Sequence, residues 1–354
     1  MLEVMPSLSA VSVLACIPAL SLLHREHLDG HGQRRSVFLT ITVCAIGLLA
    51  WLVVTAAVPT VISSPLWLPV GALGSLGVFL ATVVLRSSAQ TSAAVVIYAV
   101  GWSALVFAPI ALLTLFPERI DSVLNSTVDL GGALAVHVAA GVSAAVSLIV
   151  TRRLASQRTP GIRPHSFVLG GAALLLWVSW AISLVGLELA VDEVTSQIIV
   201  NCIIAPLAAI VGWGLIEFIR THTISLPGII AAGVAGLVVV TAGTGFLTPM
   251  WAVVAGLSAG AICASIVFTR IIADGRRGWA VLGVHGGAGI LGVVLLGIFG
   301  TGFGFIYTGQ PDRVISQLIA ALLVAAWTAL VSLGLSALIG EGSLARARMR
   351  APSV

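Results

Sequence analysis

The feature that most restricts the fold is a series of long apolar segments, separated by short breaks that carry charges, Pro and Gly. A membrane-spanning helix needs about 20 apolar residues. The expected spans are 7–23, 36–59, 66–85, 93–116, 131–151, 166–187, 195–218, 227–243, 246–270, 279–300 and 314–340. Only 8% of the 354 residues are charged, too few to cover the surface of a soluble domain. We therefore predict an all-α membrane protein of eleven transmembrane helices, with residues 1–354 forming a single transmembrane domain.

The placement of arginine predicts the orientation. The chain has no Lys, so all 17 basic residues are Arg. With the N-terminus outside, 15 of them lie in or beside cytoplasmic loops or in the tail, and only Arg119 and Arg313 lie outside. We therefore expect a multi-pass plasma-membrane protein with its N-terminus outside and its C-terminus cytoplasmic. No Arg precedes the first apolar segment, so 7–23 is expected to be a retained helix rather than a signal peptide.

Cysteine usage and catalytic motifs argue against an enzyme. The four Cys lie inside apolar segments without the spacing of metal ligands. No H-E-x-x-H or G-x-S-x-G motif and no nucleophile–base pair is recognisable. We expect no enzymatic activity, no cofactor, no metal and no nucleic-acid partner.

An internal repeat surrounds two histidines. Residues 135–148 read AVHVAAGVSAAVSL and residues 283–296 read GVHGGAGILGVVLL. Both contain V-H-x-x-A-G, with His137 in the fifth expected helix and His285 in the tenth. Two halves of five helices each insert with opposite orientation, so we predict inverted repeats over about 7–152 and 166–300, plus an extra helix at 314–340.

The two histidines are the first candidate for function. An ionisable side chain within a membrane is costly and usually faces a cavity or a partner. Two imidazoles in contact can share one proton and form a relay. Two alternatives remain: each His makes one helix–helix hydrogen bond, or the pair contributes to a zinc site, although two His alone rarely hold zinc. Just before the fifth helix, Asp129 can cap the helix N-terminus.

These same residues carry a family resemblance. Residues 129–141, D-L-G-G-A-L-A-V-H-V-A-A-G, resemble the D-x-x-G-G-x-x-V-H-x-x-A-G signature of the Amt/Mep/Rh ammonium transporters. Residues 282–292, L-G-V-H-G-G-A-G-I-L-G, are similar to that family's second signature. The stretches 200–213 and 233–249 resemble its seventh helix and its eighth helix with the following turn.

The resemblance implies an ammonium-transporter-like fold and a homotrimer with one pore per subunit. It implies that His137 and His285 are twin pore histidines, and that Leu176 and Val281 fall on pore-lining apolar positions. It also implies an outer vestibule organised by Asp129, with Trp180 beside it.

The outer vestibule departs from the family pattern. The family's stacked Phe pair falls on or near Leu76 and Ser183, and its cation-binding Trp falls near Leu115, beside Phe116. The family's vestibule Ser falls on Leu187, and its Asp five residues before the second histidine falls on Ala280. An aromatic cation site contributes about 2 kcal/mol when desolvated, so its loss weakens the expected recruitment of ammonium. Three acidic residues could supply a diffuse negative mouth instead: Glu188, Asp192 and Glu193.

The resulting hypothesis is transport of ammonium or ammonia through an apolar pore. Two alternatives stay open: a non-conducting sensor or scaffold, and a less selective channel for small neutral gases. Residues 341–354 form a short Arg-rich tail, which we expect to contact anionic membrane lipid. Regulation by a PII-type protein is not expected, because family members regulated in that way generally carry a longer C-terminal region.

Overall fold

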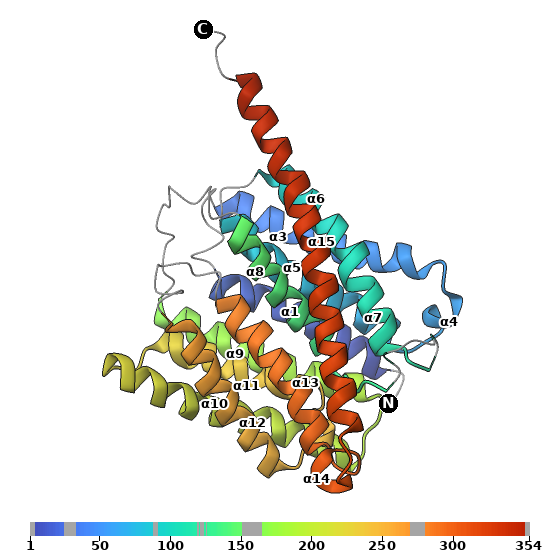
Figure 1. The fold of residues 1–354 in the computed structure, drawn as a ribbon, viewed down its shortest axis with the longest axis vertical. Helices are drawn as coiled ribbons and strands as arrows, with labels where there is room; N and C mark the ends of the chain where they lie inside the picture. Colours follow the sequence, from blue (N-terminus) through green and yellow to red (C-terminus); the bar gives the residue numbers. More distant parts are fainter. Residues whose placement is uncertain are drawn as a thin grey trace.

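The computed structural model is a bundle of helices and describes residues 4–24, 33–87, 91–118, 120, 124, 126–150, 165–269 and 280–350 (Figure 1). Residues 25–32, 151–164 and 270–279, where cytoplasmic loops are expected, lie outside the described residues, as does Arg119. The long helices of the first half are α1 (Met5–Leu23), α3 (Gln33–Thr55), α5 (Trp67–Ser87), α6 (Ser92–Trp102), α7 (Ala108–Leu115) and α8 (Ala139–Val150). Those that follow are α9 (Ser166–Glu188), α10 (Glu193–Thr221), α11 (Leu226–Thr241), α12 (Pro249–Val267), α13 (Ala288–Phe299) and α15 (Asp312–Arg350).

Short elements complete these helices. The turns α4 (Pro59–Ile62) and α14 (Phe305–Thr308) lie in connections, and η6 (Thr244–Phe246) is a 3-10 turn. Three π-helical segments continue directly into α-helices: η3 (Ser103–Phe107), η4 (Ala133–Val138) and η7 (Val281–Gly287). π-helical turns are rare in proteins. Those that do occur inside α-helices frequently lie at functional sites.

The predicted spans agree with the helices to within a few residues, except that α15 ends ten residues beyond its predicted span. Among the described residues, ten helices are long and apolar enough to cross a membrane. The segment predicted at 227–243 is α11, which has 16 residues and is shorter than a usual span. The all-α membrane fold is confirmed, and the count of eleven membrane crossings stays a prediction.

Two helix boundaries differ from the prediction because of proline. The second span was expected to reach residue 59, but α3 ends at Thr55, before Pro59. The residue before a proline is disfavoured in α-helical conformation, which explains the early end. The ninth span was expected from 246, but α12 begins at Pro249, because proline lacks an N–H and suits the first helical position.

Small residues allow the helices to approach closely. A Cβ added at Gly256 or Gly260 of α12 would lie 2.2 Å from the Ala205 oxygen or 2.0 Å from the Ala209 oxygen of α10. This Gly-x-x-x-Gly spacing places two helix backbones in contact, which is how membrane helices gain packing energy without a hydrophobic driving force.

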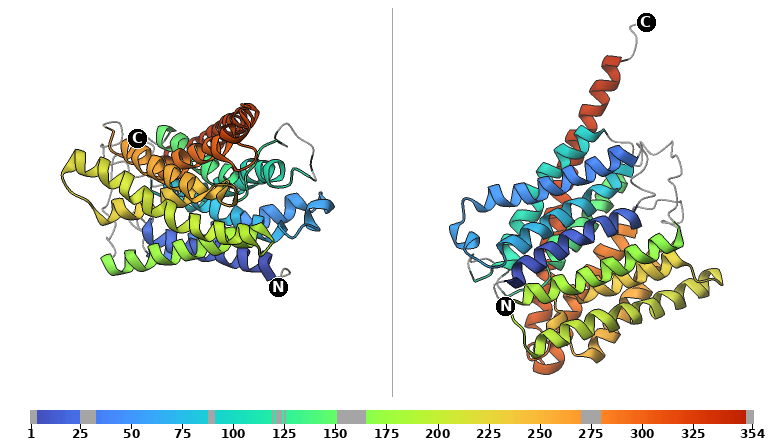
Figure 2. Two further views of the ribbon diagram at one scale, coloured as in Figure 1. Left: turned by 90° about the horizontal axis from the view of Figure 1, so that it is seen from below. Right: turned by 180° about the vertical axis from the view of Figure 1, so that it is seen from behind.

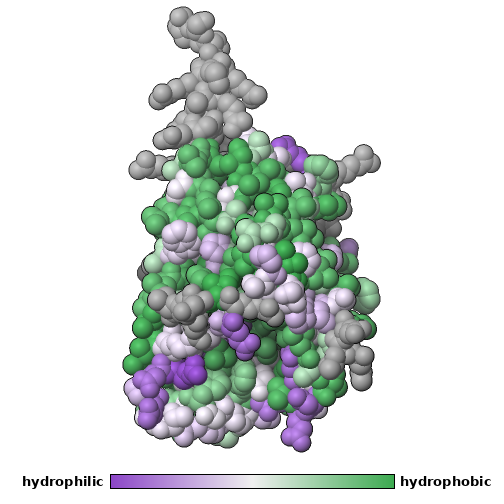
Figure 3. All heavy atoms as spheres, turned by 90° about the vertical axis from the view of Figure 1, so that its right-hand side faces the viewer, coloured by the Kyte–Doolittle hydropathy of each residue, from purple (hydrophilic) through white to green (hydrophobic). Residues whose placement is uncertain are grey.

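The surface is apolar around most of the bundle. Figure 3 shows hydrophobic residues over much of the face that it draws, with hydrophilic residues gathered near its lower end. The exposed side chains include Phe38 and Val53 on α3, and Leu322 and Leu330 on α15, each more than 60% exposed. Such a belt suits contact with lipid chains, so the molecule is a multi-pass membrane protein.

The interior places the histidine helices at the centre. η4 with α8 and η7 with α13 pack against each other, and α5, α11 and α15 surround them. Figures 1 and 2 show α15 crossing the bundle and extending beyond the other helices toward the C-terminus. The predicted extra helix at 314–340 therefore continues to Arg350.

Candidate functional site

The turn before η4 is built by the D-L-G-G sequence. Asp129 Oδ1 accepts the Ala133 N–H at 2.7 Å, and Oδ2 accepts the Leu134 N–H at 2.9 Å. Gly132 has φ +73°, a left-handed conformation that glycine adopts without strain. The carboxylate thereby satisfies two of the free N–H groups at the start of the helix.

The same turn is attached to α11. Leu130 N–H donates to the Ala242 oxygen at 2.7 Å, and Gly131 N–H donates to the Thr241 oxygen at 3.1 Å. A Cβ added at Gly131 would lie 2.5 Å from the Thr241 Cγ2, so a larger residue does not fit. Backbone contact with α11 thus fixes where η4 begins.

Asp129 is buried in this turn, with 6% of its surface exposed. Burial raises the pKa of its carboxyl to about 7, although the N–H groups of Leu134, Ala133 and Gly132 act in the opposite direction. The side chain therefore exchanges its proton near neutral pH.

The two predicted histidines meet in the core. His137 lies in η4 and His285 in η7, each as the fifth residue of its π-helical segment. Their Nδ1 atoms are 3.3 Å apart, and their ring centroids are 5.2 Å apart at an interplanar angle of 22°. Each ring is 2% exposed. Because one Nδ1 donates and the other accepts, the two rings hold opposite tautomers.

Trp180 adds a third ring to this pair. Its indole lies on His137 with centroids 5.0 Å apart at 18°, so His137 contacts both Trp180 and His285. Trp180 Nε1 donates to Thr241 Oγ1 at 3.1 Å. Thr241 therefore joins α11 to both the tryptophan and the Asp129 turn.

The glycines of the repeated motif make the crossing possible. A Cβ at Gly141, four residues after His137, would lie 2.3 Å from the Gly286 Cα. A Cβ at Gly289, four residues after His285, would lie 3.2 Å from a Val138 Cγ. Each motif glycine thus faces the residue that follows the other histidine, and this reciprocal contact brings the rings together.

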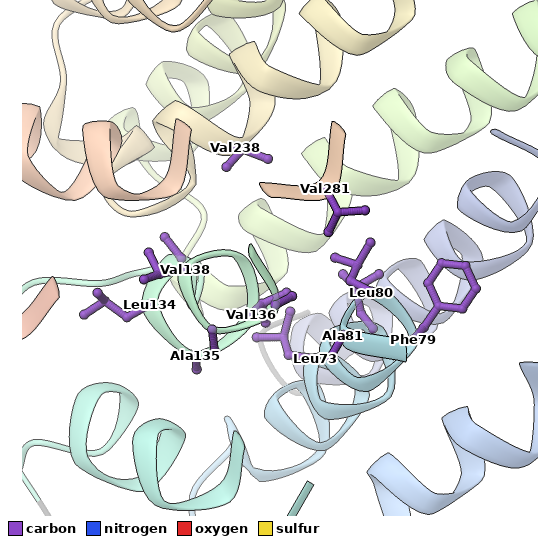
Figure 4. Packing of buried hydrophobic residues seen from close by; sticks show 14 of the residues in the cluster. Leu73, Phe79, Leu80, Ala81, Leu134, Ala135, Val136, Val138, Val238 and Val281 are labelled. Atoms are coloured by element: carbon purple, nitrogen blue, oxygen red, sulfur yellow. The ribbon is translucent and has the colours of Figure 1, made fainter. Parts of the chain in front are cut away.

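The predicted pore-lining residues are buried near the same centre. Leu176 lies one turn before Trp180 on α9, and Val281 begins η7; each is 1% exposed. Figure 4 shows Val281 among the buried side chains of the core cluster, with Val136 of η4 and Leu73 of α5. Leu176 and Val281 therefore belong to the buried apolar core.

The other predicted vestibule residues are placed differently. Leu76, Ser183 and Leu187 are 4%, 5% and 5% exposed, so they lie within the packed interior. Ser183 Oγ donates to the Trp180 oxygen, and its own backbone oxygen accepts from Ser9 of α1.

Phe116 also packs away from the histidine rings. Its ring stacks on Trp51 of α3 at 5.8 Å. Of the predicted vestibule residues, Trp180 alone among the described contacts touches a histidine ring.

Of the acidic residues expected at the mouth, two have structural partners. Glu188 accepts from Thr195 Oγ1 at 2.7 Å, and Asp192 caps α10 through the Val194 N–H at 2.7 Å. Among the residues that the structure describes, no three His, Cys, Asp or Glu side chains form a group that could hold a metal ion.

Sequence reasoning missed Thr241 and the residues after each histidine. Thr241 carried no recognisable signal, because a single Thr in an apolar helix is common. The glycine at the fourth position after each histidine was part of the repeated motif and could have indicated the close crossing.

Comparison with known proteins agrees with this geometry. The chain matches the model of the Ammonium Transporter Family over residues 70–345. An ammonium transporter of Bacillus subtilis is 30% identical over 239 residues, which cover 64% of this chain and 57% of the relative. The match thus spans a little over half the length of that relative.

Solved structures share the fold. The crystal structure of Candida albicans Mep2 superposes with a TM-score of 0.79 at 19% identity, covering 94% of this chain and 82% of Mep2. A protein described as a sensor Amt protein superposes with a TM-score of 0.74 at 17% identity, covering 96% of this chain and 95% of that protein. The family model covers most of the sequence, and the chain therefore belongs to the ammonium transporter family.

Proposed function

We propose that this protein transports ammonium or ammonia across the plasma membrane along a path that passes the histidine pair. The observation that carries the proposal is the contact between His137 and His285, whose Nδ1 atoms lie 3.3 Å apart in an apolar interior. Membership of the family and the ammonium transporter from Bacillus subtilis support the choice of substrate.

The pair has the chemistry to handle ammonia. With one proton shared between the Nδ1 atoms, one Nε2 carries a hydrogen and the other carries a lone pair. Among the described residues, no hydrogen bond from a protein group to either Nε2 is present. One ring can then donate to the ammonia lone pair, while the other accepts an N–H.

A neutral molecule suits the path better than a cation. Moving a charged ammonium ion into an apolar interior without partners costs many kcal/mol. We therefore propose that the proton separates from ammonia on the outer side, and that the histidine pair relays it or holds ammonia by hydrogen bonds.

The proposal also covers the internal symmetry of the subunit and its oligomeric state. Helices of the two halves make matching contacts: α1 with α5 and α9 with α11, α3 with α5 and α10 with α11, and α5 with α8 and α11 with α13. We propose that they form two inverted repeats. We further propose a homotrimer with the N-terminus outside and membrane lipid around it.

Transport is tested with purified protein in proteoliposomes. An ammonium concentration jump should give a current or an internal pH change that protein-free liposomes lack. Replacing His137 with Ala should reduce the flux or change its selectivity. The matched control is His165→Ala, because His165 is exposed at the start of α9. Absence of both current and ammonia flux, with folded protein, would refute the proposal.

A sensor or scaffold is the second candidate. Leu76, Ser183 and Leu187 are buried rather than lining an open vestibule, and the outer aromatic residues of the family pattern are missing. In this case wild-type protein gives no flux, and His137→Ala leaves the cellular phenotype unchanged. A less selective neutral-gas channel would instead pass carbon dioxide as fast as ammonia.

A further inference from the structure

A second group of buried polar side chains lies where α6, α8 and α15 meet. The hydroxyl seam consists of Tyr98 on α6, Ser143 and Ser147 on α8, and Thr328, Ser332 and Ser336 on α15. All six are at most 2% exposed. Residues four apart lie on one face of a helix, so the seam has one stripe on α8 and one on α15, and α15 contacts both α6 and α8.

The middle of the hydroxyl seam is bonded directly. The Tyr98 hydroxyl donates to Ser332 Oγ at 3.2 Å, and Ser332 Oγ lies 3.0 Å from Ser143 Oγ. Trp102 Nε1 donates to Ser143 Oγ at 2.8 Å, and Ser143 also donates to the Ala139 oxygen. Ser332 therefore joins α15 to the first half of the molecule.

Two hydroxyls on the α15 stripe lack a protein partner. Thr328 lies one turn before Ser332, and Ser336 lies one turn after it. The hydroxyl oxygens of both are buried, and neither has a hydrogen-bond partner among the described residues. A buried hydroxyl without a partner costs about 1–3 kcal/mol, and ordered water is the usual partner in such places.

The hydroxyl seam is separate from the histidine pair. Ser143 follows His137 by six residues, which places the two side chains about 120° apart around the helix. Gly141 of the same helix faces Gly286 of η7, whereas Ser143 faces α6 and α15 through its hydrogen bonds.

We propose that the hydroxyl seam binds ordered water at Thr328 and at Ser336. The water completes the hydrogen bonding of both hydroxyls and strengthens the attachment of α15 to α6 and α8. This inference is independent of the proposed transport.

The test is whether Thr328→Val lowers the Tm of the protein or raises it. Thr328→Val keeps the shape of the side chain and removes its hydroxyl. If the hydroxyl binds water, the variant loses those bonds and Tm falls by roughly 2 °C. If the hydroxyl is dry and unpaired, Thr328→Val leaves Tm unchanged or raises it, which would overturn the proposal. Ser336→Ala is expected to lower Tm in the same way.

The matched control is Thr82→Val on α5. Thr82 is also fully buried, but its hydroxyl donates to the Val78 oxygen at 2.9 Å. Its Tm change gives the effect of removing a hydroxyl that already has a protein partner. A wild-type density map that resolves water elsewhere provides a second readout if a variant does not fold. Density at Thr328 and Ser336 is expected, and its absence there would overturn the proposal.

Discussion

The two histidine helices have the same centre but different beginnings. In both, the histidine is the fifth residue of a π-helical segment, and a glycine four residues later faces the other helix. η4 follows a turn held by the Asp129 carboxylate and by backbone bonds to α11. η7 follows Ala280, which offers no side-chain cap. The difference teaches that both histidines lie at matching close crossings, whereas only the first histidine helix begins at a carboxyl anchor, Asp129.

The largest expected effect is at the carboxyl anchor, Asp129. Asp129→Ala leaves the N–H groups of Ala133 and Leu134 buried without acceptors and should cost about 3 kcal/mol of stability. Thermal unfolding in detergent measures this loss. Ala280→Ser at the start of η7 is the counterpart control and should change stability much less. Equal losses at the two positions would break the comparison.

Where the two histidine helices cross, a larger side chain should be tolerated less well at Gly141 than at Gly289. A Cβ at Gly141 would lie 2.3 Å from backbone, whereas a Cβ at Gly289 would lie no closer than 3.2 Å to its neighbours. Gly141→Ala should therefore cost about 2 kcal/mol through overpacking, and Gly289→Ala less than half of that. Denaturation midpoints of the two variants give the ranking, and the reverse order would contradict the reciprocal crossing.

Asp129 should also make the free energy of unfolding depend on pH. Burial raises the pKa of folded Asp129 to about 7, above its ordinary value of 3.8. The folded state then holds a proton that the unfolded chain has released, so this stabilising contribution is lost as pH rises through 7. The expected loss from pH 6 to pH 8 is about 1.4 kcal/mol. Asp129→Asn should remove this slope, and a variant that keeps the full slope would assign it to another group.

The smallest expected effect concerns the ring stack. Thr241→Val removes the acceptor of the Trp180 indole N–H and should cost about 1 kcal/mol. Indole fluorescence and Tm report this change. Trp213→Phe on α10 is a comparison variant, because Trp213 Nε1 donates to Glu217 rather than to α11. A neutral Thr241→Val variant would show that stacking on His137 alone holds Trp180.

Much of the fold could be predicted from the sequence, because lipid imposes length and hydropathy on every span. The V-H-x-x-A-G repeat identified both histidines, and their contact is confirmed. The early end of α3 was missed although Pro59 indicated it.

The outer residues were harder to predict. Resemblance places the family's tryptophan near Leu115, beside Phe116, but it carries no information on which way the Phe116 ring points. Packing against Trp51 decides that, and Trp51 lies 65 residues away in the chain. The role of Thr241 depends likewise on a contact between helices that no local pattern encodes.

The opposite tautomers of the two histidines give the proposed relay a direction that reverses with each use. A proton taken up at one Nε2 pushes the shared proton from one Nδ1 to the other and releases a third proton at the far Nε2. Afterwards the lone pair and the hydrogen have exchanged ends. Both rings are buried and Trp180 lies on His137, so the rings cannot turn over freely, and the pair must be reset before a second proton can follow the same way. Each cycle of the proposed relay therefore contains a recovery step, in which one ammonia molecule accepts the hydrogen from the first Nε2, travels past the pair and donates that hydrogen to the second Nε2, while the shared proton returns between the Nδ1 atoms.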